Sequence, residues 1–205
     1  MKTRFGLTLV ALSLVATLSM AQTPVAKGYA VGDVVADFQV RNIDNQFIAL
    51  NKYANQKGIV VVFMANHCPF AKAYEDRLMA IHNRFAPQGF PVLAVQASDV
   101  AAYPEDAYET VQSRSRERGF PFPYTIDEIQ AVARAFGATR TPQVFVLTVA
   151  NGKFVVRYSG AIDDNPQDAA GVQKRHLEDA LNSLLAGQSV TTNTTRPIGC
   201  AIKWK

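Results

Sequence analysis

Cysteine is scarce in this chain of 205 residues, which contains only Cys68 and Cys200. Two distant cysteines exclude a small scaffold held together by many disulfides. The sequence has no Cys-x-x-x-Cys spacing and no histidine close to a second ligand of the right geometry, so no metal site is supported. We therefore expect no metal and no cofactor, and the two thiols either pair with each other or serve two separate partners.

An excess of charge of one sign is also missing. The formal charge is +4, and removal of Lys2 and Arg4 with the N-terminal segment described next leaves 19 basic and 17 acidic residues, a charge of +2. Such a balance is ordinary for a soluble protein and argues against a dedicated nucleic-acid surface. We expect no nucleic-acid partner.

No apolar run reaches the ~20 residues that a comfortable transmembrane helix needs. The longest, Phe5 to Leu18, follows Lys2 and Arg4 and precedes the small-x-small sequence Ser19-Met20-Ala21. This order is typical of a secretory signal peptide, which we predict over residues 1–21. The mature protein is then periplasmic or secreted, with no membrane attachment after cleavage, in a compartment where disulfides persist. An uncleaved anchor is the alternative.

The remaining length fits one domain with a real core. We predict a linker over 22–30, one domain over 31–188, and a C-terminal tail over 189–205 that carries Cys200. Apolar patterns and turn residues within the domain predict a hairpin (37–40 and 47–50), a central buried strand (59–64), a helix (69–85), a strand (90–97), a polar surface helix (104–118), a short strand (124–126), a helix capped by Asp127 (128–136), a second hairpin (144–149 and 154–158) and a last helix (172–185). This order indicates an α/β protein with a mixed central sheet, helices on both faces and an N-terminal β-hairpin.

Cys68 stands where the apolar run 59–64 ends and the helical pattern of 69–85 begins. Unpaired N–H groups and the helix macrodipole favour a thiolate at such a position, and the thiolate is the reactive form. Pro69 suits the first helical turn because it lacks an N–H. We expect Cys68 to be the more reactive thiol, although a lone cysteine often serves only as a small core residue. Lys72, one turn on, is a candidate second positive charge or an ordinary solvated side chain.

The tail ends in an alternating pattern. Ile198, Cys200, Ile202 and Trp204 fall on one face of an extended segment, after a polar stretch of threonines. We therefore expect the tail to dock on the domain. Docking close to Cys68 would let Cys200 act as a resolving thiol, whereas a permanent Cys68–Cys200 bond would act as a structural staple.

The strand-to-helix junction at Cys68 and the sequence Thr141-Pro142 before a later strand resemble the thioredoxin fold. The segments 32–38 and 127–137 are similar to the redoxin branch of that superfamily, which includes peroxiredoxins of the AhpC/TSA type. The resemblance covers roughly residues 31–205 and implies a thioredoxin-like fold with thiol redox activity. In this fold the proline that matches Pro142 is cis, and the backbone of the residue before it, here Thr141, pairs with an extended substrate chain.

Two departures limit what the resemblance implies. The Cys-x-x-Cys motif of thioredoxins, started at Cys68, ends at Ala71, so the loop cannot perform dithiol chemistry. The Pro-x-x-x-Thr-x-x-Cys stretch of peroxiredoxins, laid over the same strand and helix, meets Met64, Cys68 and Ala71. The standard peroxiredoxin site is therefore absent.

The leading hypothesis is an exported thiol oxidoreductase of the antioxidant redoxin type. Cys68 attacks a disulfide of a protein partner or a peroxide, Cys200 resolves the product, and Thr141 and Pro142 bind substrate. His67 supports the thiolate, or is only a polar loop residue. The alternative is a thioredoxin-fold module that binds a partner protein or a soft metal without turnover, with a structural Cys68–Cys200 disulfide. The sequence leaves the substrate, the electron donor and the oligomeric state open.

Overall fold

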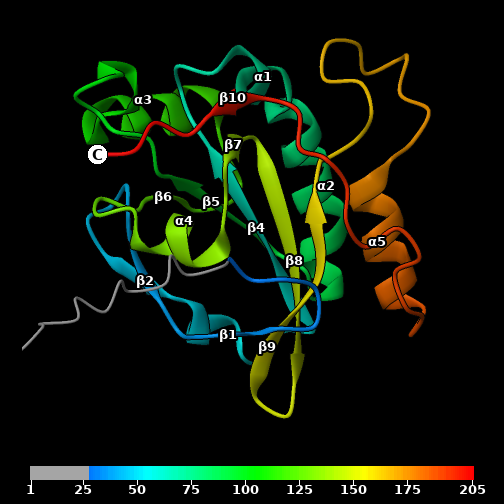
Figure 1. Cartoon of the computed structure of the whole chain (residues 1–205). Helices are drawn as coiled ribbons and strands as arrows, with labels where there is room; N and C mark the ends of the chain where they lie inside the picture. Colours follow the sequence, from blue (N-terminus) through cyan, green and yellow to red (C-terminus); the bar gives the residue numbers. More distant parts are fainter. Residues whose placement is uncertain (1–27) are drawn as a thin grey trace, which may run out of the picture.

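The computed structural model describes residues 28–205, so the predicted signal peptide and most of the predicted linker lie outside the described residues. A mixed sheet of eight strands runs through the described part, in the order β1-β9-β8-β4-β5-β6-β2-β3 (Figure 1). Its strands are β1 (Val34–Val35), β2 (Gln39–Asn42), β3 (Phe47–Ala49), β4 (Gly58–Met64), β5 (Val92–Gln96), β6 (Tyr124–Ile126), β8 (Gln143–Ala150) and β9 (Lys153–Gly160). No helix among residues 28–205 is long and apolar enough to cross a membrane.

Strand β4 is central, as its unbroken apolar sequence predicts. All seven of its residues are buried, and it pairs in parallel with β5 and antiparallel with β8. Both predicted hairpins are present: β2 pairs with β3, and β8 with β9. Asn151 and Gly152 make the second turn with φ values of 51° and 71°, a conformation that asparagine and glycine tolerate best.

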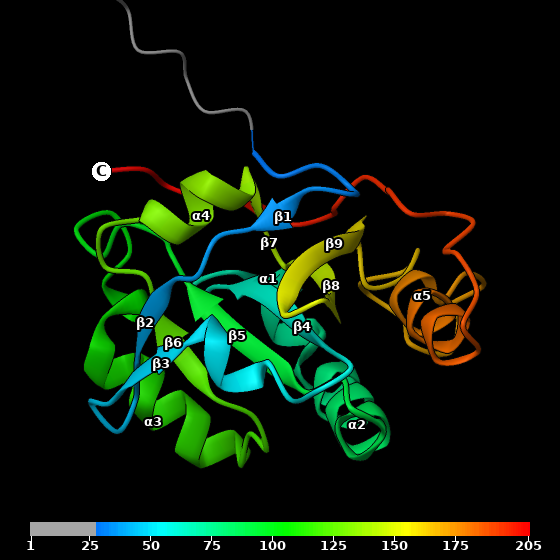
Figure 2. The ribbon, with the colours of Figure 1, turned by 90° about the horizontal axis from the view of Figure 1, so that it is seen from below.

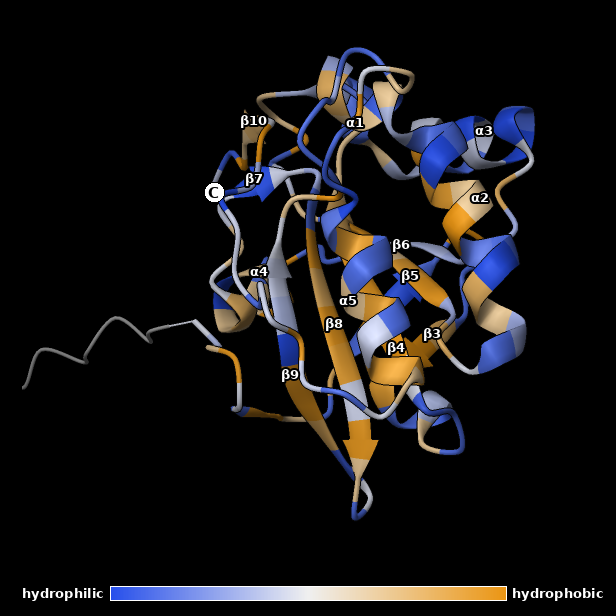
Figure 3. Ribbon diagram, turned by 90° about the vertical axis from the view of Figure 1, so that its right-hand side faces the viewer, coloured by the Kyte–Doolittle hydropathy of each residue, from blue (hydrophilic) through white to orange (hydrophobic). Residues whose placement is uncertain are grey.

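Helices cover both faces of the sheet, as predicted (Figure 2). Apolar side chains of α2 (Glu75–Phe85), α3 (Tyr108–Arg118) and α5 (His176–Leu185) pack into one core, and those of α4 (Ala131–Phe136) into the core on the opposite face. Figure 3 shows the hydrophobic residues along β4, β5 and β8, with hydrophilic residues over much of α3. Three 3-10 turns complete the helical structure: η1 (Leu50–Tyr53), η2 (Ala86–Gln88) and η3 (Pro104–Asp106).

Several predicted helix boundaries are wrong. The helix predicted over 69–85 divides into α1 (Pro69–Ala73) and α2 at Tyr74, whose backbone departs from regular α-helical values with a ψ of −6°. The segment 104–118 forms η3 and α3 separately, and its Asp106 is fully buried where a surface position was expected. The last helix begins at His176, four residues later than predicted.

The helix predicted over 128–136 begins only at Ala131. Gln130, and not the predicted Asp127, occupies its N-cap position, although the Ala133 backbone N–H in the first turn donates to Asp127 Oδ2 at 2.8 Å. Burial raises the pKa of Asp127, and the backbone N–H groups at this helix start oppose that shift. The chain reaches the helix through Gln130, whose φ of 59° puts it in the left-handed region. The pattern of apolar residues contained no sign of this turn.

Candidate functional site

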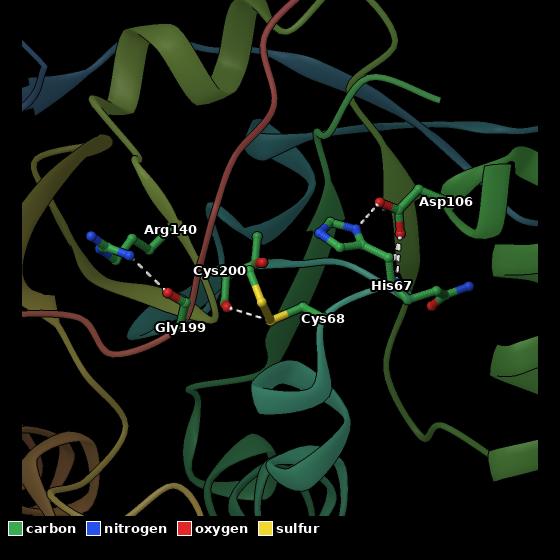
Figure 4. Close-up of a disulfide and its surroundings, with 8 residues drawn as sticks. His67, Cys68, Asp106, Arg140, Gly199 and Cys200 are labelled. Carbon is green, nitrogen blue, oxygen red and sulfur yellow. Dashed lines mark hydrogen bonds and ion pairs between the residues drawn. A yellow bond between two sulfur atoms is a disulfide. The ribbon is translucent and has the colours of Figure 1, made fainter. Parts of the chain in front are cut away.

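A disulfide joins Cys68 to Cys200, 132 residues apart in the sequence (Figure 4). Cys68 lies at the junction predicted for it, directly before α1, and has the extended backbone of an N-cap residue (φ −82°, ψ 116°). Pro69 occupies the first turn of α1, and the Lys72 N–H donates to the Cys68 carbonyl at 3.1 Å. The central strand β4 leads the chain to this junction, so the core fixes the position of the Cys68 backbone.

The tail docks on the domain as a strand, which confirms the expectation from its alternating pattern. The strand β10 (Cys200–Ala201) pairs antiparallel with β7 (Arg140–Thr141), with Cys200 opposite Thr141. The Thr141–Pro142 peptide bond is cis, as the resemblance implied. Cys68 Sγ lies 3.0 Å from the Thr141 carbonyl oxygen. The predicted residues Cys68, Cys200, Thr141 and Pro142 therefore meet in one place, and the tail itself occupies the edge assigned to a substrate chain.

Close backbone contact holds the tail at this edge. A Cβ added to Gly199 would lie 2.1 Å from the Thr141 carbonyl oxygen and 3.0 Å from the Pro142 nitrogen, which only glycine avoids. The Arg140 guanidinium donates to the Gly199 carbonyl at 2.8 Å (Figure 4). The tail therefore follows the backbone of β7 without a side chain between them at this point.

The tail is anchored on both sides of Cys200. Before it, Thr195 Oγ1 accepts the Ala161 N–H at 2.9 Å and lies 2.6 Å from the Tyr158 hydroxyl. After it, Ile202 is 4% exposed and its N–H donates to the Thr139 carbonyl at 3.0 Å. The polar threonine stretch is thus partly bound to the domain. Only residues 196–199 separate the Thr195 anchor from Cys200.

The two cysteines differ in exposure. Cys68 is fully buried under the tail, whereas Cys200 is partly exposed. A thiol that attacks the closed disulfide from solution therefore reaches Cys200 first. Lys72 is exposed and takes part in none of the hydrogen bonds and ion pairs between side chains of residues 28–205, so the structure gives no support for its role beside the thiolate.

His67 belongs to a buried polar cluster beside the disulfide. Its Nδ1 lies 2.5 Å from Asp106 Oδ2, and its ring stacks on Tyr103 with the centroids 3.6 Å apart. Asp106 Oδ1 accepts the backbone N–H groups of Asn66 at 2.6 Å and His67 at 3.3 Å. His67 is therefore more than a polar loop residue, which was one of the two alternatives for it from the sequence. Asp106 holds both its backbone and its ring.

Unpartnered polar atoms gather around the same bond. Three of the buried side-chain atoms in the described part of the chain that lack a protein partner are Asn66 Nδ2, His67 Nε2 and Thr141 Oγ1. Two belong to the residues before Cys68, and the third to the residue opposite Cys200. Buried polar atoms are normally paired, so each unpaired one needs an explanation, and a redox or catalytic role is one of these explanations.

Sequence reasoning missed Asp106 and Arg140. Asp106 lies 38 residues beyond Cys68 on a segment that looked like a solvated surface helix, and no spacing rule connects it with His67. Arg140 immediately precedes Thr141-Pro142, and this proximity was the one available indication of its contact with the tail.

The fold and the family match define the class of this protein as a redoxin of the thioredoxin-fold superfamily. The protein-family model described as AhpC/TSA family matches residues 31–164 of the chain. The chain belongs to the AhpC/TSA family. No curated protein sequence matches it.

Solved structures agree with this assignment. A hypothetical protein from Sinorhizobium meliloti 1021 is 30% identical with a TM-score of 0.79, covering 87% of this chain and 97% of that chain. An uncharacterized conserved protein from Geobacillus kaustophilus is 32% identical with a TM-score of 0.79, covering 86% and 93%. Peroxidoxin BcpB from Mycobacterium tuberculosis, 20% identical with a TM-score of 0.58 over 78% and 98% of the two chains, shares the fold. Family and fold together support a thiol oxidoreductase type of function.

The peroxiredoxin stretch is missing in either alignment. With its cysteine placed at Cys68, the proline and threonine positions fall on Val61 and Ala65, both buried and apolar. No hydroxyl is available at Ala65 to bind a peroxide oxygen. Membership of the AhpC/TSA family therefore does not bring the standard peroxiredoxin site with it.

Proposed function

We propose that this protein is an exported thiol oxidoreductase in which Cys68 is the nucleophile and Cys200 the resolving thiol. The observation that carries the proposal is the Cys68–Cys200 disulfide, formed at a strand-to-helix junction against the Thr141-Pro142 edge. Thiolates at such junctions are activated, and a second thiol in the same place completes an exchange cycle.

With a peroxide, the chemistry has two steps. The Cys68 thiolate attacks one peroxide oxygen, the O–O bond breaks, and Cys68 becomes a sulfenic acid as hydroxide leaves. The Cys200 thiol then attacks the sulfenic sulfur, which forms the disulfide and releases water. With a protein disulfide, Cys68 forms a mixed disulfide first, and Cys200 displaces the substrate thiol. Because Cys68 is buried under the tail, a small oxidant needs less displacement of residues 198–201 than a protein chain does.

The test uses reduced protein, one equivalent of hydrogen peroxide or a small disulfide, and mass spectrometry of the products. Wild type is expected to form the Cys68–Cys200 bond at least as fast as it turns over substrate. Cys200→Ser is expected to accumulate a sulfenic acid or mixed disulfide on Cys68, and Cys68→Ser to lose turnover. A Cys200→Ser variant with full turnover would contradict the proposed resolving role.

A structural staple in a non-catalytic binding module is the second candidate, and the anchors on both sides of Cys200 favour it. The midpoint potential separates the two: structural disulfides typically lie below about −300 mV, and exchanging pairs lie higher. A value in the lower range, with no turnover, would establish the staple. The metal content of reduced protein purified without added metal tests a soft-metal module.

Export is part of the proposal because the segment 1–21 has the order of a signal peptide. Mature protein from the periplasm or medium is expected to begin at Gln22. N-terminal sequencing checks this directly, and recovery of only the full-length chain would contradict cleavage.

A further inference from the structure

The pair formed by Asp106 and His67 is built into the fold. Asp106 is fully buried, and the side chain of His67 is 9% exposed. Two backbone N–H groups occupy Asp106 Oδ1, so only Oδ2 is directed at His67 Nδ1. Figure 4 draws the imidazole with its Nδ1 edge turned to Asp106 and its other nitrogen turned to the side of the disulfide. That second nitrogen, Nε2, is buried and has no hydrogen-bond partner among residues 28–205.

This geometry determines the tautomer of the neutral ring. A carboxylate only accepts hydrogen bonds, so the hydrogen bond to Asp106 Oδ2 requires the proton to be on Nδ1. Nε2 then carries a free lone pair. Tyr103 stacks on the ring at an interplanar angle of 4° and limits its rotation.

We propose that Asp106 is a positioning residue that keeps the proton of neutral His67 on Nδ1 and leaves Nε2 to transfer protons during thiol exchange at the Cys68–Cys200 bond. The inference rests on the proposed function, and it adds the residue that prepares His67 for the reaction. It does not depend on which oxidant or protein disulfide is the substrate.

The exchange step balances with one external thiol. Nε2 takes the proton of the incoming thiol, and the resulting thiolate attacks Cys200 Sγ, the more exposed sulfur. The bond between the two cysteines breaks, a mixed disulfide forms at Cys200, and Cys68 leaves as a thiolate that receives the proton from Nε2. The thiol is oxidised to one half of the mixed disulfide, Cys68 is reduced, and His67 returns to its starting state.

Neighbouring groups keep the pair in place. The Tyr124 hydroxyl donates to Asn66 Oδ1 at 3.0 Å and so fixes the residue next to His67. Burial, followed by the negative charges of Asp106 and Glu75, raises the pKa of Tyr124 well above its usual value, so its hydroxyl remains a donor. Glu75 is itself paired with Arg114 and Arg118, while the Asp106 carboxylate accepts hydrogen bonds from the Asn66–His67 segment.

Asp106→Asn tests the inference because it is expected to keep the backbone contacts and reverse the tautomer. The amide oxygen must replace Oδ1, which accepts two N–H groups, so the amide NH₂ faces Nδ1 and makes it an acceptor. The His67 proton then resides on Nε2. ¹⁵N NMR of histidine-labelled full-length protein reports the change, with His67 assigned through a His67→Gln variant. Dithiothreitol reduction of the disulfide at pH 7 is expected to slow by about 10²-fold.

Two controls separate transfer of the proton from structural support. Asp163→Asn makes the same change at another buried carboxylate, bonded to Tyr74 and Arg77, and is expected to lower stability without slowing reduction. In Asp106→Asn, reduction and reoxidation are expected to slow by the same factor, so the midpoint potential stays unchanged. His67→Gln should be equally slow, and the double variant no slower.

The outcomes are distinct from those of the function test. A reversed tautomer in Asp106→Asn with the wild-type reduction rate would overturn the inference. So would a double variant in which the Asp106→Asn substitution slows reduction beyond the rate of His67→Gln alone. If Asp106→Asn fails to fold, a wild-type rate in His67→Gln alone overturns it. This test measures the rate at which dithiothreitol reduces the disulfide, and not turnover. Asp106→Asn can therefore slow the reduction even if the Cys200→Ser variant disproves the proposed resolving role.

Discussion

Gln130 joins three segments of the chain through one buried side chain. Gln130 is 1% exposed, and its Nε2 donates to the carbonyls of Ala97 and Lys203 at 2.7 Å each. Its Oε1 accepts the Lys205 N–H at 2.8 Å. One side chain thus joins the end of β5, the start of α4 and the last residues of the tail. Leaving such a buried donor or acceptor without a partner costs about 1–3 kcal/mol.

His82 on α2 gives a prediction at the residue scale. Its Nδ1 accepts the Val92 N–H at 3.1 Å, and burial lowers the pKa of His82 from its ordinary 6.5. The unfolded chain therefore takes up this proton more readily than the folded one, so stability falls as pH drops below about 6.5 towards the lowered folded pKa. His82→Gln is expected to lose less stability over that window, since glutamine can accept the same N–H without titrating.

Thermal unfolding at pH 5 and pH 8 measures the effect. The difference in Tm between the two values should be smaller for His82→Gln than for wild type. Parallel pH dependences in the two proteins would contradict the assignment.

At the scale of elements, the contact between β7 and β10 is short but highly constrained. It comprises two residue pairs, Cys200 with Thr141 and Ala201 with Arg140. Such a short ladder has little stability of its own, and the anchors at Thr195 and Ile202 hold it in register. Figure 1 shows the tail (red) passing from α5 to the end of the sheet where β7 and α1 meet.

Gly199→Ala is expected to separate the tail from β7. The new Cβ would meet backbone atoms of Thr141 and Pro142, which cannot move aside as a flexible side chain does. We expect a loss of about 1–3 kcal/mol in the free energy of unfolding and slower formation of the disulfide. Alkylation of Cys200 in reduced protein should become faster. The matched control is Ala201→Ser, which adds one atom at an exposed position two residues further along the tail. An unchanged alkylation rate in Gly199→Ala would exclude this close approach.

At the scale of the whole molecule, the disulfide connects the centre of the sheet to the end of the chain. Cys68 follows the central strand β4, and Cys200 lies 132 residues later, after β8, β9 and α5. The bond therefore closes a loop that contains most of the domain.

Reduction of the disulfide is expected to lower the free energy of unfolding by about 2–5 kcal/mol, because the unfolded chain regains the freedom of that long loop. Urea unfolding with and without reductant measures it. Cys200→Ser should unfold at the same urea concentration in both buffers. A wild-type midpoint that does not move on reduction would contradict the prediction.

Much of the fold followed from local patterns. The apolar run at 59–64 identified the central strand, Asn151-Gly152 identified a hairpin turn, and the resemblance around Cys68 identified the superfamily. Helix starts were less accurate, since α4 begins after a left-handed turn at Gln130 and α5 begins at His176, after Arg175 with φ −93° and ψ 61°. Those boundaries depend on hydrogen bonds made by single residues rather than on periodicity.

The sequence alone determined the strand-to-helix junction at Cys68 and the docking of an alternating tail, and the resemblance supplied the cis proline. Tertiary structure alone decided that Cys200 pairs with Cys68 and that Asp106 holds His67, because both contacts join segments far apart in the chain. Periodicity reports which side of one element is buried, and it carries no information about which distant side chain meets it there. A carboxylate that reads as part of a solvated helix can therefore become the buried partner of a histidine only when the whole sheet brings η3 beside β4.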